Sequence, residues 1–218
     1  RITIAFFDPK QVIKIRSYWN DRLLEEIINQ YDAKTVKLTD QMRMNANPET
    51  MKWIDSFVEK KVLPLPTEGS SFELKIFEDA AAFKKVIENK NNKDGLSRIV
   101  STFDYLHIVD EEGINMPWHS TQSKVSWAEN PNTIKEVGSI YTVQGFDLNY
   151  VGVVLGPSVS YDEEKDELLI DTSKYKDTGA FISRTDLSPE ENQQIKEEII
   201  LNSINVLMKR GIHGLYIY

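Results

Sequence analysis

Hydrophobic residues gather in short runs along the chain, and the most informative pair of runs flanks a polar turn. The two runs, residues 138–141 and 150–155, are rich in Val, Ile and Tyr, and the second stops at Gly156-Pro157. Short apolar runs bounded by glycine are typical of buried strands. Because the apolarity is nearly continuous, these strands are expected to be covered on both faces, as in the parallel sheet of an α/β domain. The turn at residues 142–147 would then lie at a sheet edge, where open α/β folds bind ligands, although a plain strand pair joined by a turn gives the same pattern.

The rest of the chain switches between strand-like and helix-like periodicity. Strands are predicted at residues 2–7, 36–39, 72–77, 97–103, 167–171 and 214–218, and amphipathic helices at residues 12–31, 48–62, 80–89 and 189–209. Residues 63–71 form a linker rich in Pro, Gly and Ser. Residues 104–133 and 157–187 fit neither periodicity well and are interpreted as insertions, the first irregular with room for a hairpin and the second acidic and solvated. Alternation of strands and helices predicts an α/β domain with a mainly parallel sheet.

Several helix ends carry explicit signals. The start signals are Asn47 before Pro48, Asp79, and Ser188-Pro189 with Glu191 completing a capping box. Gly211 is expected to end the last helix at the C′ position.

Composition narrows the choice of function. The chain has 218 residues, 40% of them hydrophobic and 28% charged, which is ordinary for a globular protein. It contains no cysteine, which excludes disulfides and thiolate metal sites, and its three histidines lack ligand spacing, so no metal site is predicted. No apolar run approaches the roughly 20 residues of a membrane span, so a cytoplasmic location without membrane contact is expected. The net charge of -8 argues against a surface that binds nucleic acid everywhere, but a single basic groove remains compatible with it.

The polar turn also carries a recognisable motif. Thr142-x-Gln144-Gly145-x-Asp147, followed by Tyr-Val-x-Val at residues 150–153, resembles the fifth motif of superfamily 1 helicases. That motif belongs to the second of two RecA-like domains. More narrowly, the stretch is similar to the Schlafen group 3 DNA/RNA helicase domain.

Three further stretches resemble helicase motifs in the order that the family shows. Asp8-Pro9-Lys10-Gln11 resembles the third motif, whose glutamine reaches the terminal phosphate of ATP; the plain alternative is a turn in which Asp8 caps the following helix. Leu-Thr-x-Gln-x-Arg, which ends at Arg43, resembles the fourth motif, whose arginine meets the γ-phosphate; the alternative is a surface ion pair. The helix end at Lys209-Arg210-Gly211 resembles the sixth motif, whose arginine stabilises charge on the transferring phosphoryl group; the alternative is a cation that complements the helix dipole.

The resemblance implies a RecA-like domain of the P-loop NTPase type that occupies residues 1–218 and serves as the C-terminal motor half of an ATP-dependent DNA/RNA helicase or translocase-like protein. It assigns the catalytic roles to Gln11, Arg43 and Arg210, nucleotide contacts to Gly145 and Asp147, and nucleic-acid contacts to Thr142 and Gln144. Single-stranded DNA or RNA is the implied partner.

Two departures from the family pattern and one absence limit this interpretation. The family usually has Thr where this chain has Lys209, and often Glu where it has Asp147. No GxxxxGK[ST] motif and no recognisable acidic pair for Mg²⁺ occur in the chain. The chain begins at Arg1 inside a strand-like run, so we expect it to be part of a longer protein whose upstream P-loop domain supplies the other half of the ATP and Mg²⁺ site. The chain alone is expected neither to bind ATP tightly nor to hydrolyse it.

Two alternatives stay open. A degenerate RecA-like module could serve as a protein-interaction or regulatory domain without ATPase activity. An unrelated α/β enzyme that uses carboxylates of the acidic insertion is less favoured, because no constellation supports it. The alternating aromatic residues Phe103, Tyr105 and His107 could form a base-stacking edge, but packing in a core is the favoured interpretation.

Overall fold

The computed structural model describes residues 3–38, 41–67, 71–106, 113–120 and 125–218. Its centre is a five-stranded sheet in the order β1-β7-β4-β2-β3, in which every pair of neighbours is parallel. The strands are β1 (Glu73–Ile76), β2 (Ser97–Ser101), β3 (Val137–Gly138), β4 (Leu148–Val154) and β7 (Gly211–Ile217). The predicted α/β class with a mainly parallel sheet, as in RecA-like domains, is confirmed.

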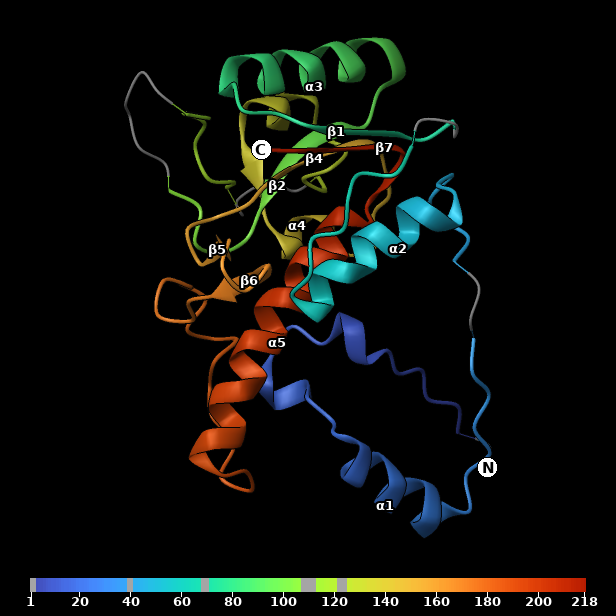
Figure 1. Cartoon of the computed structure of the whole chain (residues 1–218). Helices are drawn as coiled ribbons and strands as arrows, with labels where there is room; N and C mark the ends of the chain where they lie inside the picture. The colour runs from blue at the N-terminus through green and yellow to red at the C-terminus, as the bar shows by residue number, and fades with distance from the viewer. Residues whose placement is uncertain (1–2, 39–40, 68–70, 107–112, 121–124) are drawn as a thin grey trace.

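Helices cover both faces of this sheet (Figure 1). On one face lies α3 (Ala80–Asp94), whose Phe83 and Ile87 are fully buried. On the other lies α5 (Pro189–Met208), with α2 (Pro48–Ser56) beside it. The short α4 (Ile140–Val143) also packs on α5. The layers explain the continuous apolarity of β4, whose two faces meet α3 and α5.

The predicted helix starts are confirmed. Asn47 caps α2 by accepting a hydrogen bond from the Thr50 N–H (2.8 Å), and Asp79 caps α3 through the Ala82 N–H (2.5 Å). At α5, Ser188 Oγ accepts from the Glu191 N–H (3.1 Å) while Glu191 Oε2 accepts from the Ser188 N–H (2.7 Å), which is the expected capping box. These three helix starts are therefore determined by hydrogen bonds within the first turn of each helix.

The N-terminal predictions are partly wrong. Residues 3–7 and 36–38 are not strands, because no other described strand pairs with them. The helix predicted at residues 12–31 begins only at Asp21, where Asn20 caps α1 (Asp21–Tyr31) through the Leu23 N–H (2.9 Å). Ahead of it the chain forms two 3-10 turns, η1 (Pro9–Gln11) and η2 (Ile15–Ser17).

Several other boundaries differ from prediction, and α3, for example, ends at Asp94 instead of residue 89. The strand expected at residues 138–141 is β3 followed by α4, because Thr142 Oγ1 accepts from the Ser139 N–H (2.9 Å) and closes a helical turn. The second helix ends earlier and continues as the 3-10 turn η3 (Phe57–Glu59), which stops at Lys60 with a φ of 58°. Gly211 is the first residue of β7 rather than a C′ cap, and it is required there because a Cβ would lie 2.1 Å from the Gly214 carbonyl oxygen.

The predicted insertions contribute to the core. Residues 157–187 contain an antiparallel hairpin of β5 (Val159–Asp162) and β6 (Glu167–Ile170), and Leu168 and Tyr175 are buried rather than solvated. In the other segment, the described residues 113–120 and 125–136 form no hairpin; they contain the 3-10 turn η4 (Pro131–Lys135). Aromatic packing agrees with the core interpretation, since Phe103 lies edge-on to Trp118, 5.3 Å away. Tyr105 stacks on the same indole (5.7 Å), and His107 falls outside the described residues.

A polar clamp joins the edge strand β1 to its neighbours. Glu73 accepts hydrogen bonds from Lys90 Nζ of α3 and from the Tyr216 hydroxyl of β7 (2.6 Å). Desolvation raises the pKa of Glu73, but these hydrogen bonds and the charge of Lys90 outweigh it and lower the pKa to about 2. The carboxylate form is therefore the one that stabilises the fold.

Glu73→Gln is expected to lower the free energy of unfolding at neutral pH. Because the folded pKa is depressed, the contribution of Glu73 is complete above its ordinary pKa of 4.5 and is lost as the pH falls through about 2. Urea unfolding of both proteins between pH 7 and pH 2 should show curves that converge in acid. A difference that stays constant with pH would contradict the assignment.

No helix in the described part of the chain combines the length and the apolar composition that a membrane crossing requires.

Candidate functional site

Two of the predicted site residues lie side by side at one edge of the sheet. Asp147 directly precedes β4 and Arg210 directly precedes β7, and the Leu148 N–H donates to the Arg210 carbonyl (2.9 Å). The pair therefore lies at the amino ends of two adjacent parallel strands. The turn at residues 142–147 therefore lies at the amino ends of the strands. Open α/β sheets bind ligands at the carboxyl ends of their strands, so the expected position of this turn was wrong.

Arg43 reaches the same place from a distant part of the sequence. The Asn45 N–H donates to the Ile212 carbonyl (2.9 Å), which aligns residues 41–45 with the start of β7. Gln41 Oε1 accepts from the Met44 N–H (3.0 Å) and holds the turn. The Arg43 guanidinium then forms an ion pair with the Asp147 carboxylate. The two side chains are 38% and 46% exposed, so this ion pair adds little to the stability of the fold. It matters because it holds the positive charge of Arg43 close to Arg210.

Arg210 is the most unusual group at this edge. Its residue is 5% exposed, and Nη1 donates one long hydrogen bond to the Phe146 carbonyl (3.4 Å). Its Nε is buried and has no hydrogen-bond partner among the described residues. Burial is the main cause that lowers the pKa of Arg210, and Arg43 lowers it further while Asp147 raises it. A buried cation with an unmet donor is costly, so an anionic acceptor would be bound favourably here.

Gln11 lies in η1, which packs against α5. Its Nε2 donates to Asp8 Oδ2 (2.8 Å), and Asp8 Oδ1 accepts from the Lys10 N–H (3.0 Å), so Asp8 caps this 3-10 turn rather than the helix that was predicted to follow it. The segment is fixed by Asn202, whose Nδ2 donates to the carbonyls of Pro9 and Val12, both at 2.9 Å. Asn202 is on α5, the helix that ends next to Arg210. The fold therefore connects the Gln11 segment to the arginine through one rigid element.

Lys209, which stands where the family usually has Thr, has a structural partner. Its Nζ donates to Asp55 Oδ1 on α2 (2.6 Å), and Lys10 Nζ lies 3.7 Å from the same oxygen. Sequence reasoning missed both Asp55 and the anchoring role of Asn202. The signal for the latter was available, because Asn202 and Asn205 interrupt the apolar face of α5 and are buried.

The remaining site residues form the turn before Asp147. Gly145 has a φ of 85° and nothing lies within 4 Å of the position of a Cβ, so the backbone conformation, rather than crowding, requires glycine. Gln144 is exposed, whereas the Thr142 hydroxyl is engaged with the Ser139 backbone. The structure thus brings together Arg43, Asp147 and Arg210 and places Gly145 and Gln144 next to Asp147 in sequence, whereas the Gln11 side chain bonds to Asp8 in its own segment.

Two other features bear on the choice of site. A surface hollow of about 490 Å³, lined by Arg16, Trp19, Leu23 and Arg184, lies near the start of α5. None of the residues that line this hollow belongs to the group of Arg43, Asp147 and Arg210. Among the described residues no group of three or more His, Asp or Glu side chains could hold a metal ion.

Comparison with known proteins gives the family. The chain matches a family model described as the Schlafen group 3 DNA/RNA helicase domain over residues 1–218. It is similar to a Saccharomyces cerevisiae protein described as uncharacterized protein YPL245W, with 32% identity over 249 residues. That alignment covers 100% of this chain and 54% of the yeast protein, so the chain spans about half the length of the relative. No solved structure matches the chain. With a match over its full length, the chain belongs to the family of Schlafen group 3 DNA/RNA helicase domains.

Proposed function

We propose that this domain is the C-terminal motor half of an ATP-dependent DNA/RNA helicase or translocase-like protein. The observation that carries the proposal is Arg210, a buried guanidinium whose Nε lacks a partner among the described residues, next to the second guanidinium of Arg43. Two cations at one edge are suited to the phosphate chain of a nucleotide. ATP with Mg²⁺ would lie between this edge and an upstream P-loop domain, because the chain itself lacks a phosphate-binding loop.

Each residue has a distinct role in this proposal. Arg210 stabilises the charge that develops on the transferring phosphoryl group, from a fixed position that needs no reorganisation. Arg43 leaves Asp147 for the γ-phosphate, because a bidentate phosphate contact is stronger than a half-exposed ion pair. Asp147 is then available for the ribose, beside the backbone of Gly145.

Closure of the site would be transmitted in two directions. Gln11 senses the terminal phosphate and is connected to Arg210 through Asn202 and α5. Thr142 and Gln144 lie in the turn before Asp147 and would pass the movement to a single strand of DNA or RNA. In this scheme the domain supplies charge and position, and bound ATP supplies the bond that is broken.

ATP hydrolysis by the complete protein tests the proposal. We expect turnover that single-stranded DNA or RNA stimulates, and no measurable turnover by the 218-residue chain alone. Gln11→Ala should lower the stimulated rate by about a hundredfold, because a misplaced sensing group costs positioning at the reacting centre. Gln193→Ala is the matched control, since Gln193 is exposed on α5 and bonds only to surface side chains: it donates to Thr172 Oγ1 (2.9 Å) and accepts from Lys196 Nζ (3.4 Å). Equal rates for the two variants would argue against the motor assignment.

A second candidate is a RecA-like interaction or regulatory module without ATPase activity. The observations that favour it are the mutual neutralisation of Arg43 and Asp147 and the structural use of Lys209 in the ion pair with Asp55. In that case the complete protein would show no stimulated turnover, and neither glutamine variant would change its properties.

A further inference from the structure

The N-terminal part of the chain exposes an unusual amount of apolar surface. Phe6 is 87% exposed, Val36 81% and Leu38 80%. Every described residue of 3–10 and of 31–38 is exposed, although residues 4–7 are an apolar run and the second stretch carries Val36 and Leu38. The helix between them, α1, has no buried residue, and its apolar side chains are only half-buried. Isolated exposed apolar residues are common, but a contiguous set of this kind marks a surface that another partner covers.

The order of these segments is that of a strand–helix–strand unit. Residues 3–7 and 36–38 have strand-like composition, and the amphipathic α1 lies between them. Parallel strands that are joined by a helix need further strands beside them to satisfy their backbone groups. The five-stranded sheet of this domain does not provide them, because neither segment pairs with it.

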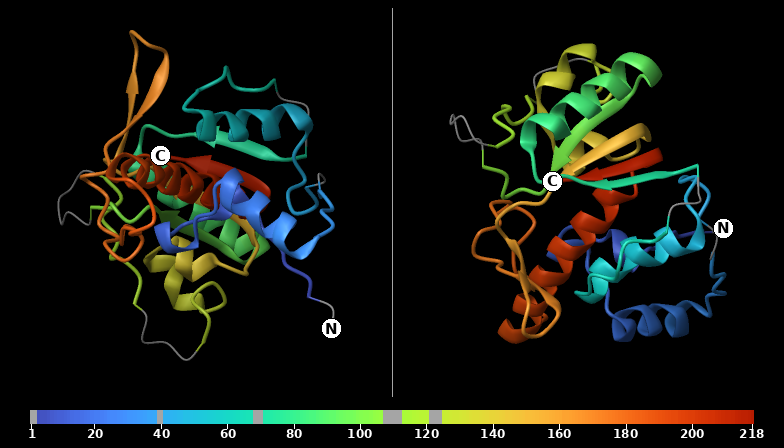
Figure 2. Two further views of the ribbon diagram at one scale, coloured as in Figure 1. Left: turned by 90° about the horizontal axis from the view of Figure 1, so that it is seen from below. Right: turned by 45° about the horizontal axis from the view of Figure 1, so that its top comes forward.

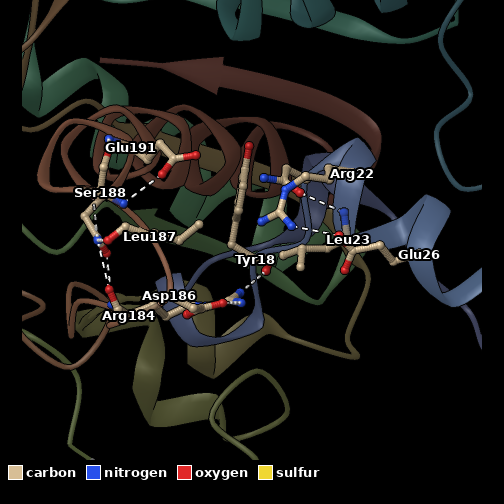
Figure 3. Close-up of polar contacts among 11 residues, drawn as sticks. Tyr18, Arg22, Leu23, Glu26, Arg184, Asp186, Leu187, Ser188 and Glu191 are labelled. Carbon is tan, nitrogen blue, oxygen red and sulfur yellow. Dashed lines mark hydrogen bonds and ion pairs between the residues drawn. The ribbon is translucent and has the colours of Figure 1, made fainter.

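The clearest contacts that attach this unit to the rest of the described domain lie between the first segment and α1. Ile15 is fully buried against Leu187, Ile195 and Ile199, and its N–H donates to the Ala180 carbonyl (2.9 Å). Close by, Arg184 donates to the Tyr18 carbonyl (2.5 Å) while it forms an ion pair with Asp186 (Figure 3).

The unit itself projects beyond this anchor. In Figure 1 and in the right view of Figure 2, α1 lies on the far side of α5 and α2 from the sheet. The anchored residues therefore belong to the fold described above, and the flanking segments extend away from it.

We infer that residues 3–7, α1 and residues 36–38 are a strand–helix–strand unit that completes the sheet of a second domain in the same polypeptide. The two apolar segments add as strands to the edge of that sheet, and the apolar face of α1 packs on it. Main-chain hydrogen bonds of this kind give affinity, and the alternate side chains Ile4 and Phe6 give register. The functional boundary between the two domains then falls after residue 38, within the chain, rather than at its start.

The yeast relative favours a second domain of the same polypeptide, rather than a second copy of this chain, as the partner that covers this surface. This chain covers 54% of that protein, so the relative contains enough additional chain for a second domain. A covalently linked partner also meets the unit at high effective concentration, which suits strands that are too short to pair tightly on their own. The inference rests on the proposed function only in expecting a second α/β domain, and it does not require that domain to hydrolyse ATP.

Amide hydrogen exchange, measured without nucleotide, tests the inference. In the 218-residue chain the amides of residues 3–7 and 36–38 should exchange fast. In the polypeptide from the complete reading frame they should be protected by roughly a hundredfold or more, since they are then part of a sheet. Equally fast exchange in the complete polypeptide, or a reading frame that encodes no second domain, would overturn the inference.

Matched variants of the complete polypeptide separate docking from folding. The pair Phe6→Asp and Leu38→Asp should abolish protection at residues 3–7 and 36–38 and leave that of β4 and β7 unchanged. Leu65→Asp is the control, because Leu65 is also exposed (54%) but lies outside the unit. Protection that appears in the isolated chain together with a dimeric mass in light scattering would assign the surface to a second copy and refute the inference. An inactive ATPase with intact protection would refute the proposed function alone.

Discussion

Arg210→Ala is expected to lower the nucleic-acid-stimulated ATPase of the complete protein by about a thousandfold or more, the range known for arginine fingers. The side chain is buried at the amino end of β7, so its charge acts in a poorly hydrated position where electrostatic stabilisation is strong. Arg210→Lys should rescue little of this loss, because an ammonium cannot reproduce the planar fork of donors. The effect should fall on kcat rather than on KM, since the contact strengthens in the transition state.

The control for Arg210 is Arg22→Ala. Arg22 is 61% exposed on α1 and forms an i,i+4 ion pair with Glu26 (2.8 Å), so its removal should leave the ATPase unchanged. Urea unfolding of each variant shows whether the fold is intact. If folded Arg210→Ala retains the parent rate, the interaction-module alternative replaces the motor assignment.

Trp53→Ala is expected to have the largest effect on stability. Trp53 is 2% exposed, packs edge-on against Phe57 with ring centroids 4.9 Å apart, and donates from Nε1 to the Leu63 carbonyl (2.7 Å). Truncation removes a large buried surface, leaves a cavity between α2 and α5, and orphans the carbonyl. We expect a loss of about 3–5 kcal/mol in the free energy of unfolding.

The matched control for Trp53 is Trp19→Ala. Trp19 is 39% exposed and lies ahead of α1, so its truncation should cost less than about 1 kcal/mol. Both values come from urea unfolding followed by far-ultraviolet circular dichroism. Equal losses for the two variants would show that α2 is not part of the cooperative core.

Local signals in the sequence predicted the starts of three capped helices, although the cap of α1 at Asn20 was missed. Asn47, Asp79 and Ser188 each hydrogen-bond within three residues, so the chain needs no distant partner to begin a helix there. The apolar run of β4 was equally informative, because only a strand buried on both faces tolerates it. The residues proposed for the site came instead from the resemblance to helicase motifs, because the local pattern alone indicated only a ligand at the end of the sheet.

Other features depended on contacts that no local pattern contains. Whether residues 3–7 and 36–38 form strands depends on a neighbouring strand, and a composition that favours strands cannot supply one. Gly211 stands where a glycine often ends a helix, but it pairs with Leu148 in the sheet and is the first residue of β7. A Cβ at this position would collide with the Gly214 carbonyl.

The sequence by itself determined the fold class and the starts of three capped helices, and its resemblance to helicase motifs named the charged groups of the candidate site. The tertiary structure alone decided their arrangement. Arg43 meets Asp147 across 104 residues of chain because residues 41–45 align with the start of β7. Arg210 is 5% exposed and its Nε is buried without a partner among the described residues, which is a result of packing that the sequence motif does not contain. Proximity and desolvation are properties of the packed chain, and the chemistry proposed for this domain depends on both.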